Sequence, residues 1–224
     1  MAHGYASTSN ASEAIPVFDI PGFVLFPHTL VPFHVFEKRY GAMLDACLAE
    51  RRLMVVAGRK PGWENQLGND GEVTEIAGLG RVLSDRRFHD GRYNIFVHCI
   101  ARVKIVRTHQ FAPYRIVDLE SVDDVEGNPI ALNAAAGKMK SLGESLVREL
   151  GEDGGALSKI LSSSDDPAIL SFRLAGFMLQ ETDEKQEVLE MLTPYERCEF
   201  LAGCFAERLM GVSEEQSPVN RWMN

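Results

Sequence analysis

The spacing of the apolar residues changes once along this chain of 224 residues, close to Glu126. Between Tyr93 and Ile105 every second residue is apolar or small, which is the period of a β-strand with one buried face. Beyond Pro129 apolar residues recur every three to four positions, which is the period of an amphipathic helix. A block of strands followed by a block of helices predicts an α+β fold.

The first block is expected to form a small β-barrel. Residues 73–83 and 93–106 predict a hairpin, because the intervening Asp90-Gly91 is typical of tight turns. The second strand is long enough to bend and to be shared by two sides of the barrel, which a strand at 114–122 then closes. A buried strand is predicted at 52–57. Proline-flanked apolar runs predict edge strands or turns at 15–18 and 23–27.

One helix and one long loop interrupt this block. The helix begins near Glu37, and its apolar face is expected to carry Tyr40, Met43, Leu44, Cys47 and Leu48. Residues 58–72 form a polar loop, and loops of this length are often functional or mobile. Trp63 in this loop has two interpretations: it anchors the loop on the barrel, or it offers an exposed contact to a ligand.

The second block predicts four helices in a bundle. The first runs over 132–150 and is followed by a stretch rich in Gly, Asp and Ser. Asp166-Pro167 is typical of an N-cap with proline in the first turn, Thr182 begins a third helix, and Thr193 with Glu196 forms a capping box before the last helix, which runs to about residue 209. The sequence therefore divides into a β-rich unit at 14–125 and a helical unit at 126–211, with flexible tails at 1–13 and 212–224.

The net charge of −9 is concentrated in the helical unit. Residues 15–125 hold 14 basic and 14 acidic residues, whereas residues 126–224 hold 9 basic and 17 acidic residues, a net charge of −8. The simplest interpretation is a solvated acidic surface on the helices. An acidic chain is a poor candidate for a protein whose main task is to bind phosphate backbones, although a charge-balanced barrel leaves RNA contact open for that unit alone.

Motifs that carry catalytic or metal chemistry are missing from the sequence. It contains no G-x-x-x-x-G-K-S/T phosphate loop, no H-E-x-x-H, no G-x-S-x-G and no S-x-x-K. Its 4 cysteines form no C-x-x-C pair, its 6 histidines are scattered, and the paired carboxylates Asp123-Asp124 and Asp165-Asp166 fall where turns and helix caps are expected. We therefore expect no enzymatic activity, no catalytic residue, no cofactor and no metal.

The sequence also suggests a cellular compartment. No stretch approaches the roughly 18 consecutive apolar residues of a membrane-spanning helix, and the first dozen residues lack the apolar core of a signal peptide. Together with cysteines expected to remain as free thiols, this indicates a cytoplasmic protein without membrane contact.

A small cluster at the predicted hairpin tip is a candidate contact site. Arg86, Arg87 and Phe88 combine positive charge with an aromatic ring beside His89. Such a cluster can touch an RNA base or a peptide, or it can simply be the solvated end of a hairpin. With Trp63, these three residues are the candidate ligand contacts.

Two proline-rich motifs near the start carry a family resemblance. Residues 15–27 read I-P-V-F-x-I-P-G-x-V-L-F-P and residues 32–40 read P-F-H-V-F-E-x-R-Y, which closely resembles the opening of the Lon protease N-terminal, substrate-binding domain. Further similar segments are Gly80-Arg81-Val82, residues 90–95 and residues 184–190. The likeness extends over roughly residues 15–209. The position of His28 often holds glycine in this family, so the local turn is expected to differ.

This resemblance implies a PUA-like pseudo-barrel followed by a helical bundle. It also implies a stand-alone, non-catalytic module that binds unfolded or misfolded polypeptide segments, or a protease or chaperone partner, because the ATPase and Ser–Lys protease motifs of Lon enzymes are missing. In the second motif we interpret Phe36 and Tyr40 as core residues and expect Glu37 and Arg39 to connect the helix start to the barrel. RNA or nucleotide recognition is the alternative, since PUA-like barrels can bind RNA.

Overall fold

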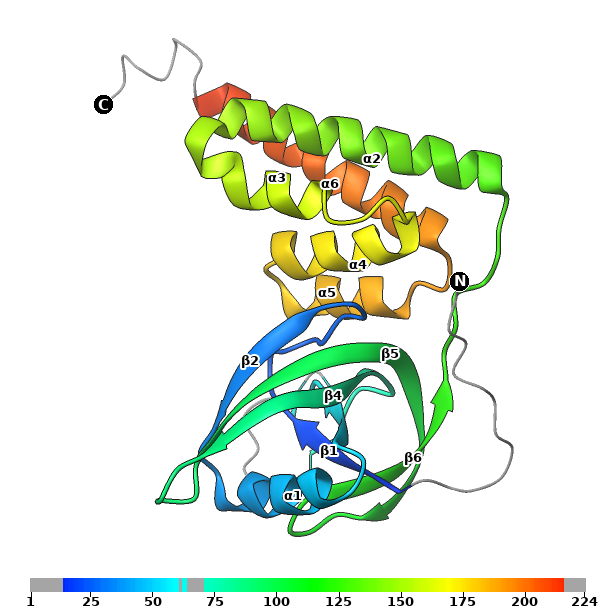
Figure 1. The fold of residues 1–224 in the computed structure, drawn as a ribbon. Helices are drawn as coiled ribbons and strands as arrows, with labels where there is room; N and C mark the ends of the chain where they lie inside the picture. The colour runs from blue at the N-terminus through cyan, green and yellow to red at the C-terminus, as the bar shows by residue number, and fades with distance from the viewer. Residues whose placement is uncertain (1–13, 61, 64–70, 216–224) are drawn as a thin grey trace.

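The computed structural model describes residues 14–60, 62–63 and 71–215 and shows an α+β fold, with the strands first and most helices after them (Figure 1). The strands are β1 (Ile15–Asp19), β2 (Leu30–Val35), β3 (Leu53–Ala57), β4 (Ile76–Arg87), β5 (Tyr93–Gln110) and β6 (Arg115–Ser121). The helices are α1 (Lys38–Ala49), α2 (Pro129–Leu150), the 3-10 turn η1 (Gly151–Gly154), α3 (Gly155–Leu161), α4 (Pro167–Met178), α5 (Thr182–Glu190) and α6 (Pro194–Glu215).

Strand β5 organises the barrel. Its 18 residues pair with β4 along one edge, and along the other edge with β2 first and β6 afterwards. The order β5-β4-β3-β1-β6 returns to β5 and so closes the ring, and register shifts near Val82 and Arg107 bend the long strands. The prediction of a hairpin whose second strand is shared between two sides of a small barrel is confirmed.

Two strands contain a proline, and the pairing of each strand explains how that proline is accommodated. Pro32 lies in β2, which among the described strands pairs only with β5, and an edge strand tolerates a residue without an amide hydrogen. The expectation of an edge strand is wrong for β1, which lies between β3 and β6 and pairs in parallel with β3. Its Pro16 is accommodated because the pairing with β3 begins only at Val17.

Residues 23–27 form no strand but connect the two units. Leu25 packs into the barrel core, whereas Val24 and Phe26 pack among the helices, where the Phe26 ring lies 6.0 Å from that of Phe172 in α4. The following residue His28 has φ 62°, a left-handed conformation that favours glycine. His28 therefore adopts a backbone conformation that glycine favours, and the difference expected for this turn stays a prediction.

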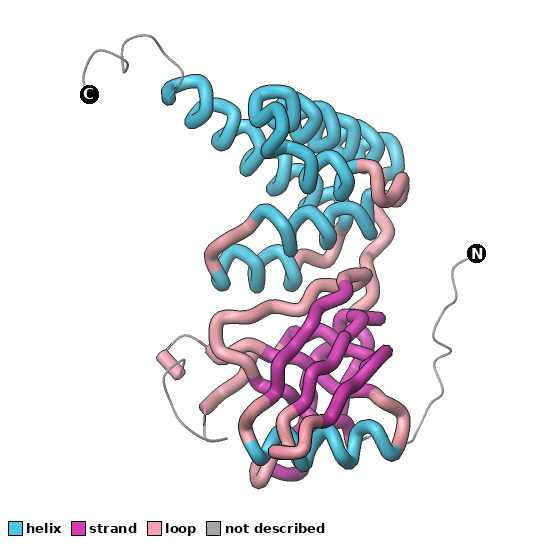
Figure 2. The backbone as a smooth tube through the Cα atoms, turned by 60° about the vertical axis from the view of Figure 1, so that its left-hand side comes forward, coloured by secondary structure: helices cyan, strands magenta, loops and turns pink. Residues whose placement is uncertain are grey.

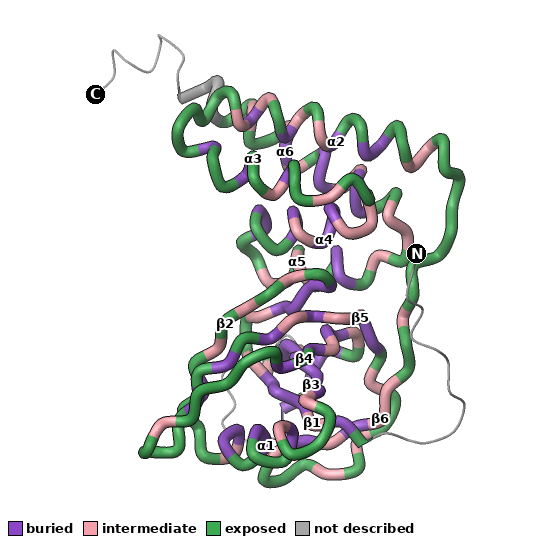
Figure 3. The backbone as a smooth tube through the Cα atoms, viewed as in Figure 1, coloured by how far each residue is buried: buried purple, intermediate pink, exposed green. Residues whose placement is uncertain are grey.

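Three apolar clusters make up the interior. Two of them line the two sides of the β-sheet, one around Met54, Val97 and α1, the other around Val55 and Val117. The third lies between the helices and includes Leu174, Leu201 and Phe205, all fully buried. Figure 3 shows the buried positions concentrated inside the barrel and between the helices, with exposed positions on the outer surfaces of α2 and of the β4–β5 hairpin.

The predicted helix signals are confirmed, and one helix was missed. Asp166 caps α4 through its side chain, and Thr193 and Glu196 exchange the hydrogen bonds of a capping box. Asn128, which was not predicted as a cap, caps α2 in the same way. The Gly-rich stretch after α2 was expected to lack a helix, but it holds η1 and α3, and α6 extends to Glu215. Figure 2 shows helices α2–α6 stacked on one end of the barrel, with α1 at the opposite end. Among the described residues, no helix combines the length and the apolar character needed to cross a membrane.

Candidate functional site

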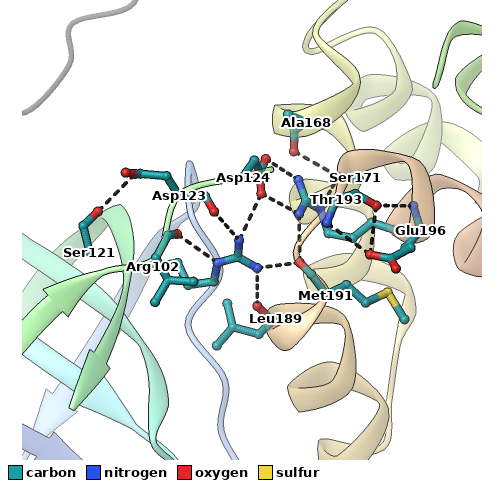
Figure 4. Close-up of polar contacts among 12 residues, drawn as sticks. Arg102, Ser121, Asp123, Asp124, Ala168, Ser171, Leu189, Met191, Thr193 and Glu196 are labelled. Atoms are coloured by element: carbon teal, nitrogen blue, oxygen red, sulfur yellow. Dashed lines mark hydrogen bonds and ion pairs between the residues drawn. The ribbon is translucent and has the colours of Figure 1, made fainter. Parts of the chain in front are cut away.

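The most elaborate polar contacts of the described structure join the barrel to the helices (Figure 4). Arg102 of β5 projects into this junction with its side chain only 2 % exposed. Its guanidinium donates to the carbonyl oxygens of Leu189 and Met191, at 2.7 and 2.6 Å, and its Nε donates to the carbonyl of Val122 at 3.2 Å. Burial lowers the pKa of this arginine, and the neighbouring carboxylate of Asp124 partly offsets the shift.

Asp124 connects this arginine to a second one. Its Oδ1 accepts from Arg102 at 3.1 Å and from Arg197 of α6 at 2.7 Å, and its Oδ2 accepts from Arg197 at 2.6 Å. Arg197 is completely buried, lies 4.0 Å from the centre of the Phe172 ring and donates through Nε to Ser171 at 3.0 Å. One carboxylate therefore serves two buried guanidinium groups.

The junction is a structural clamp because its groups bind one another. Both arginines direct their donors to carbonyl, hydroxyl and carboxylate oxygens of the chain, which is how a buried charge is tolerated. The sequence interpretation placed Asp124 in a turn and missed its partners. A usable signal was Arg197, which precedes Leu201 and Phe205 at helical spacing on the buried stripe of α6.

The predicted contact residues Arg86, Arg87 and Phe88 lie where the sequence placed them, at the end of β4 and in the following turn. They point in different directions. Arg87 turns toward α1, 3.4 Å from Asp45, whereas the Arg86 guanidinium lies 5.4 Å from the Phe88 ring. Arg92 covers the same ring at 5.7 Å, so Phe88 is half-buried between two arginines.

The motif at residues 32–40 that carries part of the family resemblance has some side chains in the core and others on the surface. Tyr40 is buried, as expected, and donates its hydroxyl to the carbonyl of Asp19 at 2.8 Å. Phe36 was expected in the core but is 69 % exposed, because Val35 before it occupies the inward position at the end of β2. Glu37 and Arg39 form an ion pair with each other at 2.8 Å at the start of α1.

Phe36 lies at the end of a surface formed by β2, β5 and β4, which we call the outer face. The alternating residues of β2 and β5, among them Val35, Ile95 and Val97, face the barrel core. Their neighbours in sequence therefore point outward. The outer face consists of Leu30, Pro32, His34, Arg81, Leu83, Ser84, Arg86, Asn94, Phe96 and His98.

Trp63 is half-buried and lies next to Gly71. Its amide donates to the carbonyl of Lys60 at 3.1 Å, and its carbonyl accepts from Arg59 at 3.4 Å. Most of the predicted loop, residues 61 and 64–70, lies outside the described residues. The two interpretations of Trp63 thus remain predictions.

Two shallow clefts open on the described surface. One, of about 330 Å³, lies between α1 and the β1–β6 pair, with Cys47, Arg51 and Tyr114 on its walls. The other, of about 380 Å³, lies beside the junction between the linker after Asp124 and the start of α6 at Pro194. The first cleft has Cys47 and Glu50 in its lining, but the Cys47 thiol donates to the carbonyl of Leu53 at 3.2 Å, and burial raises its pKa to about 11. The lining of the second cleft holds no Ser, Thr, Cys or Lys side chain that could act as a nucleophile.

Metal-binding and thiol chemistry also lack a centre in the described part of the chain. No group of three His, Cys, Asp or Glu side chains is arranged there to hold a metal ion. All four cysteines are free thiols, and burial raises the pKa of Cys99 to about 12 and those of Cys47 and Cys198 to about 11. Thiols with raised pKa values are poor nucleophiles at neutral pH.

Comparison with known proteins agrees with this architecture. The chain is 21% identical to the Lon protease of Desulfosudis oleivorans over 186 residues, and 23% identical to Lon protease 2 of Thermus thermophilus over 185 residues. Each alignment covers 83% of this chain but only 23% of the relative, so the chain spans about a quarter of the length of these proteins.

Solved structures show the same fold. The N-terminal domain of Mycobacterium avium complex Lon protease superposes with a TM-score of 0.67 at 19% identity, covering 87% of this chain and 98% of that one. The Lon N-terminal domain protein from Xanthomonas campestris superposes with a TM-score of 0.60 at 18% identity, covering 85% and 97%. The family model of the ATP-dependent protease La (LON) substrate-binding domain matches residues 14–203. The chain belongs to this family of Lon substrate-binding domains.

Proposed function

We propose that this protein is a non-catalytic module that binds exposed segments of other polypeptides. The observation that carries the proposal is the match to a substrate-binding domain across residues 14–203, which includes both the barrel and the helices. The outer face supports it, because large apolar side chains that are exposed side by side on a folded protein are typical of interaction surfaces.

The proposal includes the organisation of the chain. The β-rich unit at 14–125 supplies the outer face, the helical unit at 126–211 is joined to it through the buried arginines, and the module acts in the cytoplasm without catalytic residues in these two units. The proposed partners are unfolded or misfolded polypeptide segments, or a protease or chaperone with which the module acts.

Binding to an unfolded protein tests the proposal. Fluorescence anisotropy with labelled, reduced and carboxymethylated α-lactalbumin as the probe is expected to show saturable binding, and the native form of the same probe serves as the control. Equal binding to both forms, or no binding to the unfolded form at high micromolar protein, would overturn the proposal. Hydrolysis of either probe or turnover of added ATP would contradict the non-catalytic part.

A further inference from the structure

We propose that the outer face of β2, β5 and β4 binds an extended polypeptide segment in which an apolar residue is flanked two positions away on each side by a carboxylate. This assignment rests on the proposed function and adds to it a docking surface and a sequence pattern, acid–x–apolar–x–acid. It follows from the apolar centre of the face, from its unpaired charges and from the distance between them.

Three large apolar side chains form the centre of the face. Phe96 is 47 % exposed, and Leu83 and Leu30 are each 56 % exposed. Phe96 of β5 pairs with Pro32 on one side and with Ser84 on the other, and the register shift beside Ser84 places Leu83 at the bulge. These side chains come from three adjacent strands, so they form one continuous apolar surface and not scattered exposed residues.

Two arginines flank this centre without an acidic partner. Neither Arg81 nor Arg86 forms an ion pair with another described residue. Their neighbours do: Arg87 pairs with Asp45, and Arg92 pairs with Asp90. None of the residues that make up the outer face is acidic. Two positive charges beside an apolar surface are complementary to a ligand that carries both apolar groups and carboxylates.

The arginine spacing sets the pattern of the ligand. Arg81 and Arg86 lie five positions apart in β4, and because one intervening residue is taken up by the bulge, their Cα atoms are about 13 Å apart at roughly 3.3 Å per residue. In an extended ligand, residues i, i+2 and i+4 share one face, and i to i+4 spans about 13 Å. Carboxylates at i and i+4 therefore reach the two arginines when the apolar residue at i+2 lies over Phe96 and Leu83.

A polypeptide fits this face better than a nucleic acid does. Two free arginines neutralise only two phosphates, which provides little of the electrostatic attraction on which nucleic-acid binding depends. Two of the three large apolar side chains of the centre are leucines, and only Phe96 is aromatic, whereas single-stranded nucleic acids are bound by successive bases stacking on aromatic rings. A chain with a net charge of −9 also repels a polyanion beyond this face.

Matched peptides test the pattern on the full chain by fluorescence anisotropy. The probe is a labelled peptide of about ten residues with one Asp–x–Leu–x–Asp unit, and its control has the same composition with the aspartates moved to the positions next to the leucine. A third peptide carries lysine in place of both aspartates. We expect the first to bind at least roughly tenfold more tightly than the other two, with an affinity that falls as salt is raised.

Variants locate the binding. Phe96→Ser is expected to lower the affinity for the aspartate peptide by roughly fivefold or more. The double variant R81E/R86E is expected to bind the lysine peptide more tightly than the aspartate peptide, which reverses the preference. Phe177→Ser and Arg148→Gln are matched controls, because Phe177 is 42 % exposed on α4 and Arg148 is exposed at the end of α2. A reversed preference requires a folded face, so loss of folding cannot mimic it.

Each remaining outcome overturns the assignment. Tight binding of unfolded α-lactalbumin that is unchanged in Phe96→Ser and R81E/R86E keeps the proposed function but removes this face from it. Displacement of the probe by an oligouridylate at low salt assigns the face to RNA. Self-association that Phe96→Ser abolishes, seen by analytical ultracentrifugation, assigns it to a second copy of the chain.

Discussion

Removing the charge of Asp124 while keeping its shape is expected to destabilise the fold more than any exposed carboxylate does. In Asp124→Asn, the two contacts of Arg197 with this residue, of 2.7 and 2.6 Å, lose their charge, and one of the two oxygens is replaced by an amide group that donates. Arg197 then keeps one hydrogen bond to the neutral amide oxygen, together with Ser171, the carbonyl of Met191 and the Phe172 ring. Breaking a buried ion pair costs about 3–5 kcal/mol. The side chain of Asp124 is 28% exposed, so water compensates in part, and we expect the lower end of this range, about 3 kcal/mol.

Arg102 contributes less to this loss. It gives up one contact at 3.1 Å with Asp124 but keeps the carbonyl oxygens of Leu189, Met191 and Val122. A second variant separates the two arginines. In an Arg197→Met background the added cost of Asp124→Asn is expected to fall to about 1 kcal/mol, because the completely buried guanidinium that needed the charge is gone.

Urea unfolding followed by circular dichroism measures both effects. With a slope of about 2 kcal/mol per molar urea, a loss of about 3 kcal/mol moves the midpoint by about 1.5 M. Asp165→Asn is the control, since Asp165 is fully exposed and pairs with Lys140 at 3.4 Å, and it is expected to leave the midpoint unchanged. A loss below about 1 kcal/mol for Asp124→Asn, or an equal loss in both backgrounds, would refute the clamp.

Three further predictions concern the interior. Gly137→Ala on the exposed side of α2, where an added Cβ meets nothing within 4 Å, is expected to raise the free energy of unfolding by about 0.5–1 kcal/mol. Gly78→Ala is expected to lower it by about 2–3 kcal/mol, because the added Cβ meets the backbone of the 23–27 segment. Equal effects of the two substitutions in urea unfolding would contradict the close packing of β4 against that segment. Tyr40→Phe removes a buried hydrogen bond and is expected to cost about 1 kcal/mol, and an unchanged midpoint would show that the contact contributes nothing. Burial raises the pKa of the Cys99 thiol to about 12, and it also raises the pKa of the half-buried Cys204. In the native protein at about pH 8, Cys204 should therefore react with Ellman's reagent well before Cys99, and both should react quickly in urea. Early labelling of Cys99 would argue against its burial.

Local signals in the sequence were reliable because their partners are a few residues away. Asp166 caps α4 through the amide of Ala168, and Thr193 and Glu196 bind each other, so the residues that form each motif also determine where the helix begins. The turn at Asp90-Gly91 is equally local, with Gly91 at φ 86°. These parts of the fold could be predicted without knowledge of the tertiary structure.

Features that depend on distant partners could not be predicted in this way. The composition of α3 is poor for an isolated helix, and it is held because Leu157 and Leu161 are buried against other helices. The apolar run at 23–27 looks like a strand, but its side chains fill two different cores. Phe36 follows the alternation of β2 onto the surface, which only the register with β5 reveals.

Four arginines of the chain fall into two pairs, according to whether acceptor groups of the protein itself bind their guanidinium groups. Arg102 and Arg197 are buried and direct their donors to internal oxygens, whereas Arg81 and Arg86 are exposed without an ion pair to any described residue. The first pair fixes how the helices sit on the barrel, and the second lies on a sheet surface that this clamp does not cover. Stability and binding are therefore expected to respond to different substitutions: Asp124→Asn should shift unfolding while peptide preference is retained in the folded fraction, and R81E/R86E should change peptide preference with little effect on the urea midpoint.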